Sequence, residues 1–191
     1  TAIWKQRTTQ FNEMADNGLV NSADSRNLDI ILVSCDAGDQ NLLRELLATH
    51  SISVVMHFAG SIVMPESVMD PLFYYHNNTV VSRSLIAACI SAGVNAFIFS
   101  STGTVYGEPD KLPVNEIAPI DPITPYSRSK LMTEWILEDV SKSSDMNYAV
   151  LRYFNVAGAD PKGRTGQCSP KATHLIKVAS EVASGKRNKM E

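Results

Sequence analysis

Short apolar runs that alternate with longer amphipathic segments constrain the fold of this chain more than any other feature. The apolar runs are rich in β-branched and aromatic residues and predict strands at residues 29–35, 52–58, 96–101 and 148–153. The segments between and after them predict helices at residues 40–50, 70–92, 125–142 and 172–184. Strands that alternate with helices form right-handed βαβ units. We therefore expect an α/β fold with a doubly wound, mostly parallel, Rossmann-like sheet.

Composition narrows the class of function. The 191 residues, 44% of them hydrophobic, are enough for one substantial core. The net charge of -3 comes from interspersed acidic and basic residues, which does not favour a nucleic-acid partner. No apolar run reaches the roughly eighteen residues that cross a bilayer, and the polar first residues do not resemble a signal peptide. We expect a cytoplasmic protein without a membrane partner, whose native start is missing because the chain does not begin with Met.

The cysteines and histidines predict neither disulfides nor a metal site. Cys35, Cys89 and Cys168 are odd in number and form no C-x-x-C pair, so buried thiols in a reducing compartment are expected. The four histidines have no ligand-like spacing. No metal is therefore expected to take part in the chemistry.

A hydroxyl-rich strand end is the first candidate for a functional site. The apolar run 97–99 opens into Ser100, Ser101 and Thr102. In open parallel sheets, ligands bind at the carboxyl ends of the strands. These three side chains are therefore expected at the ligand-binding edge of the sheet.

The helix expected at 125–142 carries a second candidate, the pair Tyr126 and Lys130. Thr124 suits the N-cap and Pro125 the first helical position, which places the pair on one face near the helix start. A tyrosine pKa of about 10 must fall by about three units to serve a general base near neutral pH. A lysine ammonium about 5 Å away contributes a little over two units at an effective dielectric of about 20, and a second positive charge would supply the rest. In the alternative interpretation, Tyr126 packs on the sheet and Lys130 is solvated, but the hydroxyl cluster favours a site.

Six sequence blocks, in their order and spacing, carry a family resemblance. They are HFAG at 57–60, PESV at 65–68, YYHNN at 74–78, FIFSSTGTVYG at 97–107, YSRSKL at 126–131 and LRYFNVAGA at 151–159. Between Asp16 and Lys189, the chain resembles the extended short-chain dehydrogenase/reductase superfamily, and within it the UDP-glucose 4-epimerase family.

The resemblance implies interconversion of UDP-galactose and UDP-glucose by inversion at C4 of the sugar. A bound NAD would be reduced and then reoxidised in each turnover. Tyr126 would take the proton from the sugar 4-hydroxyl, and Lys130 would hold the NAD ribose and lower the pKa of Tyr126. Thr102 would hydrogen-bond the same sugar oxygen and relay the proton. The implied partners are a UDP-sugar and a second copy of the chain, paired through a bundle of helices such as 71–92 and 125–142.

The resemblance also assigns binding residues. Asp36 would read the adenine amino group, and Asp16 would accept the ribose hydroxyls unless it is an ordinary turn aspartate. The residues expected to bind NAD are Asp16, Asp36, Ala37, Phe58, Ala59, Gly60, Asn78, Ser100, Tyr126, Lys130 and Tyr153. The residues expected to bind substrate are Thr102, Tyr126, Phe154, Asn155 and His174.

The chain departs from the family pattern at its beginning. Gly18 is the only glycine in residues 1–34, so the first strand and the G-x-x-G-x-x-G turn that would hold the pyrophosphate are expected to be missing. Ile62 stands where some members place a phosphate-contacting lysine. We expect residues 1–155 to form a partial NAD-binding domain and residues 156–191 to begin an incomplete sugar-nucleotide domain.

Several alternatives to an active epimerase remain open at this point. The chain could be a catalytically inactive fragment or a non-enzymatic binding module of the family, because the glycine-rich turn is missing. It could also be a nucleotide-sugar 4,6-dehydratase or decarboxylase, although dehydratases place Asp-Glu after the strand-end Thr and this chain has Gly103-Thr104. A Walker A loop at 158–165 is disfavoured, since Arg164 takes the place of the lysine.

Overall fold

The computed structural model describes residues 31, 33–167 and 174–190, which fall into two compact units. One unit is residues 35–156 and contains the sheet. The other comprises the described residues before 35 and after 156, and includes helix α7 (Leu175–Ala183). Asp16, Cys168 and the expected start of the last helix at 172–173 lie outside the described residues.

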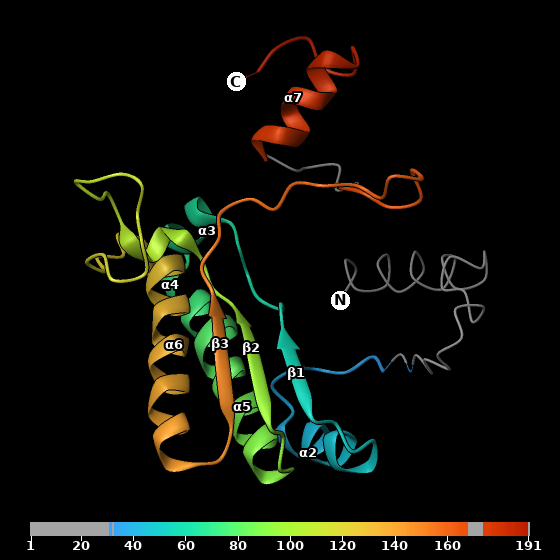
Figure 1. Ribbon diagram of the computed structural model, residues 1–191, viewed down its shortest axis with the longest axis vertical. Coiled ribbons are helices and arrows are strands. Elements are labelled where there is room, and N and C mark those ends of the chain that lie inside the picture. Colours follow the sequence, from blue (N-terminus) through green and yellow to red (C-terminus); the bar gives the residue numbers. More distant parts are fainter. Residues whose placement is uncertain (1–30, 32, 168–173, 191) are drawn as a thin grey trace. The chain divides into compact units, whose positions relative to one another are not determined.

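The sheet has three parallel strands in the order β1-β2-β3. They are β1 (Val54–His57), β2 (Ala96–Ser100) and β3 (Asn147–Leu151). Their carboxyl ends lie at one edge because the register pairs His57 with Phe99 and Ser100 with Leu151. The parallel α/β fold predicted from the sequence is confirmed (Figure 1).

Helical segments connect the strands of this unit. Before β1 stands α2 (Gln40–Thr49), and the crossover from β1 to β2 contains α3 (Met64–Met69), α4 (Pro71–Tyr74), the π-helical segment η1 (Tyr75–Val80) and α5 (Val81–Ser91). The crossover from β2 to β3 contains the 3-10 turn η2 (Gly103–Tyr106) and α6 (Pro125–Ser143). None of the helices in the described part of the chain is long and apolar enough to span a membrane.

Local capping explains where the two long helical stretches begin. The Asp70 carboxylate accepts the N–H of Phe73 at 3.1 Å, and Thr124 and Ser127 form a capping box at the start of α6. Pro71 and Pro125 stand in the first turns, where proline costs no hydrogen bond. The helices predicted at 70–92 and 125–142 are therefore confirmed, the first with a π-helical insertion that the sequence did not reveal.

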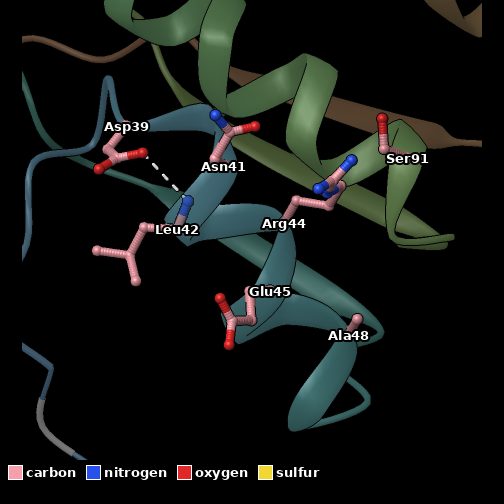
Figure 2. Close-up of a pocket in the computed structure, with 7 residues that line it drawn as sticks. All are labelled: Asp39, Asn41, Leu42, Arg44, Glu45, Ala48 and Ser91. Carbon is pink, nitrogen blue, oxygen red and sulfur yellow. Dashed lines mark hydrogen bonds between the residues drawn. The ribbon is translucent and has the colours of Figure 1, made fainter.

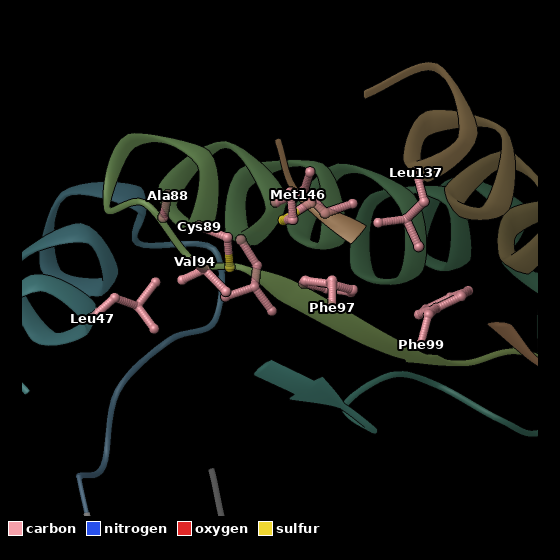
Figure 3. Packing of buried hydrophobic residues seen from close by; sticks show 10 residues of the cluster. Leu47, Ala88, Cys89, Val94, Phe97, Phe99, Leu137 and Met146 are labelled. Atoms are coloured by element: carbon pink, nitrogen blue, oxygen red, sulfur yellow. The ribbon is translucent and has the colours of Figure 1, made fainter. Parts of the chain in front are cut away.

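The core lies between β2 and the helices. Phe97 and Phe99 point to the same face of β2 and are fully buried, whereas Ile98 points to the other face. Figure 3 shows them packed with Leu137 of α6 and Cys89 of α5. The strand that leads to the hydroxyl cluster is thus anchored in the core by these two rings.

Two sequence predictions are wrong in the described residues. Residues 31 and 33–35 form no strand, although 29–35 was expected to be one. The described sheet consists of β1, β2 and β3, so residues 33–35 have no place in its ladder. Cys35 is exposed in a loop, whereas Cys89 is buried as expected.

Candidate active site

The end of β2 places Thr102 where it can contact both flanking elements. The N–H of Ser101 donates to the carbonyl of Leu151 at 3.0 Å, and the N–H of Gly103 donates to the carbonyl of Tyr153 at 3.0 Å. These bonds extend the pairing with β3 past the end of the strand. Thr102, between them, is extended and only 4% exposed, and its hydroxyl caps η2 by accepting the N–H of Thr104 at 3.2 Å.

The structure brings Thr102 together with Tyr126, as expected. The Thr102 hydroxyl lies close enough to the phenol of Tyr126, in the first turn of α6, to influence the pKa of that phenol. Burial raises the pKa of Tyr126, the Thr102 hydroxyl opposes that effect, and the neighbouring Tyr153 adds to it. The net shift is upward, so the phenol keeps its proton at neutral pH.

Lys130 lies one turn further along α6 and is buried. Its ammonium donates to the carbonyl of Ser100 at 3.1 Å and lies 5.1 Å from the centre of the Phe99 ring. Burial lowers its pKa to about 8. The expectation that Lys130 lowers the pKa of Tyr126 stays a prediction. The Lys130 ammonium is directed at the strand end.

The π-helical segment η1 presents Asn78 to the same region. Asn78 is 1% exposed, accepts the N–H of Ser61 at 2.8 Å, and donates to the carbonyl of Ser61 and the hydroxyl of Ser129 at 3.0 Å each. Short π-helical insertions often occur at functional sites because they turn one side chain out of the regular helical register. Here the amide of Asn78 joins the loop after β1 to α6.

Gly60 brings the backbone of that loop against Lys130. Its φ is +152°, and a Cβ at this position would lie 2.9 Å from Oδ1 of Asn78 and 3.2 Å from Nζ of Lys130. Only glycine fits this conformation and this approach. Within the described residues the Lys130 ammonium has one hydrogen bond, so two of its three N–H groups can bind a diol such as a ribose. The cradle at Gly60 and the direction of Lys130 fit a dinucleotide cofactor.

The end of β3 contributes the remaining predicted residues of this unit. The hydroxyls of Ser100 and Tyr153 hydrogen-bond each other. Phe154 is 74% exposed and its ring covers Gly103, where a Cβ would lie 2.7 Å from ring carbons. Asn155 follows and is exposed. Both residues stand at the carboxyl edge with their side chains accessible to a ligand.

Other predicted residues lie apart from this cluster or cannot be placed against it. Phe58 and Ala59 are exposed in the loop after β1. Asp36 and Ala37 lie in the turn before α2, where the Asp36 carboxylate accepts the N–H of Gly38 at 2.7 Å. His174 belongs to the other unit.

The sequence analysis missed a buried charged pair behind the cluster, Glu134 and Arg152, joined by a contact of 2.6 Å. A weak signal was available, since Glu134 is four residues after Lys130 and therefore on the same face of α6. Nothing in the sequence indicated that it would be only 5% exposed.

A separate depression lies on α2, away from these residues. Figure 2 shows its lining, which comes from α2, its N-cap and the end of α5: Asp39, Asn41, Leu42, Arg44, Glu45, Ala48 and Ser91. It shares no residue with the cluster around Tyr126. The strand-end cluster therefore remains the candidate active site.

A parallel α/β sheet whose middle strand leads into a buried threonine, beside a helix with Tyr-x-x-x-Lys in its first turns, defines a protein of the extended short-chain dehydrogenase/reductase superfamily. The comparison with known families agrees with this assignment. A model of the NAD dependent epimerase/dehydratase family matches residues 2–189, and the chain belongs to that family.

Individual relatives make the resemblance more specific. The chain is 54% identical to a UDP-glucose 4-epimerase of Azospirillum brasilense over 82% of this chain and 45% of the relative. A UDP-glucose 4-epimerase of Brucella ovis, solved in complex with NAD, is 40% identical with a TM-score of 0.77 over 82% of this chain and 48% of that one. A UDP-Glc/GlcNAc 4-epimerase of Campylobacter jejuni is 45% identical with a TM-score of 0.70 over 90% and 52%. The chain spans about half the length of the curated relatives it matches.

Proposed function

We propose that this chain carries the catalytic centre of a UDP-glucose 4-epimerase, which interconverts UDP-galactose and UDP-glucose with NAD as cofactor. The proximity of buried Thr102 to the Tyr126 phenol, with buried Lys130 one turn further along α6, is the observation that carries the proposal. The relatives named for this activity support it. On this proposal, residues 1–155 belong to the NAD-binding domain and residues 156–191 begin the sugar-nucleotide domain.

The cofactor would be held by the residues around the strand end. Lys130 would donate to the ribose hydroxyls, and Gly60 would let the backbone approach closely. Ser100 and Tyr153 would stand beside the nicotinamide. NAD, when bound, supplies the transient oxidation at C4 of the sugar.

The chain's own residues would move the proton. The Thr102 hydroxyl can both accept and donate a hydrogen bond, so it can pass the proton of the sugar 4-hydroxyl to Tyr126 and return it. Tyr126 is protonated at neutral pH in the chain alone because burial raises its pKa. A positive charge close to the phenol is therefore required before Tyr126 can act as the base, and an oxidised nicotinamide carries a charge of that sign.

The structure offers a steric argument against dehydration chemistry. Where dehydratases place Asp-Glu after the strand-end Thr, this chain has Gly103 and Thr104. The Phe154 ring occupies the space into which any side chain at position 103 would project.

A nucleotide-release assay tests the proposal. The purified chain is denatured, the supernatant is analysed for NAD, and interconversion of UDP-galactose and UDP-glucose is measured in parallel. Tyr126→Phe is expected to abolish turnover, whereas Tyr148→Phe, a half-exposed tyrosine on β3, is expected to preserve it. If the unaltered chain released no NAD and showed no turnover, the proposal for this chain would be contradicted.

Two finer predictions accompany the proposal. The homodimer through a helix bundle would have apolar residues available on α4 and α6, since Leu72, Phe73 and Trp135 are exposed. Sedimentation equilibrium of the chain tests this pairing. A cytoplasmic location stays a prediction from the sequence.

A further inference from the structure

A buried ion pair lies directly behind the candidate active site. Arg152 approaches Glu134 with two nitrogens, Nη2 at 2.6 Å and Nε at 3.0 Å from the same carboxylate oxygen, Oε2. Glu134 is 5% exposed, and the side chain of Arg152 is 21% exposed. The pair joins α6 to the end of β3.

The pair also holds two further segments. The Ser101 hydroxyl donates to Oε1 of Glu134, and Nη1 of Arg152 donates to the Tyr106 hydroxyl at 2.8 Å. The guanidinium also lies 5.1 Å from the centre of the Tyr106 ring. Four side chains thus connect α6, the end of β2, η2 and the end of β3.

Three members of this network adjoin residues of the proposed site. Ser101 immediately precedes Thr102, and Arg152 immediately precedes Tyr153. Glu134 follows Lys130 by four residues, and therefore lies one turn along the same face of α6. A shift of the network would consequently move the groups that must meet for proton transfer.

Stability alone does not explain such a pair. Removing two charges from water costs several kcal/mol per ion, and apolar residues of similar volume are often as stable or more so. What an ion pair with several directed hydrogen bonds does supply is fixed geometry, since the planar guanidinium matches the carboxylate in one orientation.

We propose that Glu134 and Arg152 are positioning residues that fix the Thr102 hydroxyl against the Tyr126 phenol by holding Ser101 and Tyr106 to α6. Their effect on catalysis rests on the proposed function. Their effect on the placement of the Thr102 hydroxyl beside Tyr126 does not, and can be measured in this chain without cofactor or substrate.

The test follows the ionisation of Tyr126 by fluorine NMR after incorporation of 3-fluorotyrosine, whose phenol ionises at lower pH than tyrosine. Tyr126→Phe assigns the resonance. The double variant Glu134→Met/Arg152→Met replaces the pair with apolar side chains and is expected to remain folded. Because the nearby Thr102 hydroxyl lowers the phenol pKa, displacing that hydroxyl should raise the titration midpoint by about 0.5 to 1 pH unit.

Two further variants make the result decisive. Glu138→Met/Lys142→Met removes an exposed ion pair of 2.8 Å from the same helix and should leave the midpoint unchanged. Arg152→Lys keeps the positive charge but loses the planar guanidinium that binds Glu134 with two nitrogens. If the double variant does not fold, the titration of Arg152→Lys tests the positioning role instead. The proposal would be overturned if the Tyr126 midpoint of the folded double variant, or of Arg152→Lys, lay within about 0.2 pH unit of the midpoint of the unaltered chain.

If the unaltered protein has epimerase activity, steady-state kinetics of the variants give a second, separate test. Loss of the pair is expected to lower kcat at least about tenfold while KM changes less than about twofold, because positioning acts on the reacting groups rather than on binding. A change in KM alone would contradict the positioning role. Absence of turnover in the unaltered chain would count against the proposed function, while the fluorine titration would still decide the role of the pair.

Discussion

The hydroxyls of Thr102 and Thr104 lie 3.0 Å apart, so the two side chains share a hydrogen bond. Thr102 also accepts the N–H of Thr104 at 3.2 Å. One of its two acceptor positions is therefore taken, and its own proton is directed either to Thr104 or to Tyr126. The polarity of the Thr102 hydroxyl thus depends on a residue that the sequence analysis did not include in the site.

Thr104→Val is expected to lower the pKa of Tyr126. Without the Thr104 hydroxyl, the Thr102 proton has Tyr126 as its remaining acceptor in this cluster, and donation to the phenol favours its ionised form. The fluorine titration of Tyr126 should show a fall of about 0.5 pH unit or more. Thr104→Ser keeps the hydroxyl and should titrate like the unaltered chain, so a fall in both variants would refute this account.

Gly60→Ala is expected to destabilise the unit containing the sheet by about 2 kcal/mol or more. The new methyl group would meet the Asn78 amide at 2.9 Å, and that amide is fixed by hydrogen bonds to Ser61 and Ser129. Urea unfolding of the two proteins measures the difference.

Gly93→Ala provides the matched control for this collision. Gly93 also has a positive φ, +71°, but nothing lies within 4 Å of the position that a methyl group would take there. Its substitution should therefore cost only the backbone strain, about 1 kcal/mol. If both variants lost the same stability, the contact between position 60 and Asn78 would not constrain the loop.

Thr124→Ala is expected to lower the free energy of unfolding by about 1 kcal/mol. The Thr124 hydroxyl accepts the N–H of Ser127 at 3.2 Å, and the Ser127 hydroxyl accepts the N–H of Thr124 at 3.1 Å. Tyr126 stands inside the turn that these bonds close, so fraying would also broaden its fluorine resonance. Thr124→Ser keeps the cap and should lose only a few tenths of a kcal/mol in urea unfolding, and an equal loss in both variants would argue against the cap.

Local patterns were enough to predict the elements that carry the site. The helix from Pro125 follows from its cap and first-turn proline, and the strand before Ser100 from its apolar residues. The placement of Thr102 at the ligand-binding edge then follows from the rule that parallel strands present their carboxyl ends at one edge. The helix start and the strand depend on sequence neighbours within a few positions.

Other features depend on partners distant in the sequence and could not be predicted. Glu134 and Arg152 are 18 residues apart, and burial of a carboxylate runs against its usual exposure until its partners are known. Residues 33–35 have strand-like composition, but a strand exists only with a neighbour to pair with. The direction of the Lys130 ammonium toward Ser100 likewise depends on packing that helical spacing does not determine.

The stability of the unit that contains the sheet is expected to fall as the pH falls from about 6.5 to about 4, because His57 is buried in a neutral form. The Ser82 hydroxyl donates to the carbonyl of Asn78, so Nε2 of His57 must donate to Ser82, at 2.7 Å. A second proton would place an imidazolium between the Phe97 and Phe99 rings and near the Lys130 ammonium. Burial and this charge lower the pKa of His57 from 6.5 to about 4.

The unfolded chain therefore binds more protons than the folded chain between these two pH values. As the pH is lowered from 6.5 to about 4, the free energy of unfolding decreases by about 3 kcal/mol. Urea unfolding between pH 7 and pH 4.5 measures the slope. His57→Gln cannot take up the proton and should flatten the dependence, whereas His50→Gln, at an exposed position, should keep it. Equal slopes in all three proteins would mean that His57 protonation does not limit stability in acid, and that carboxylates account for the whole dependence.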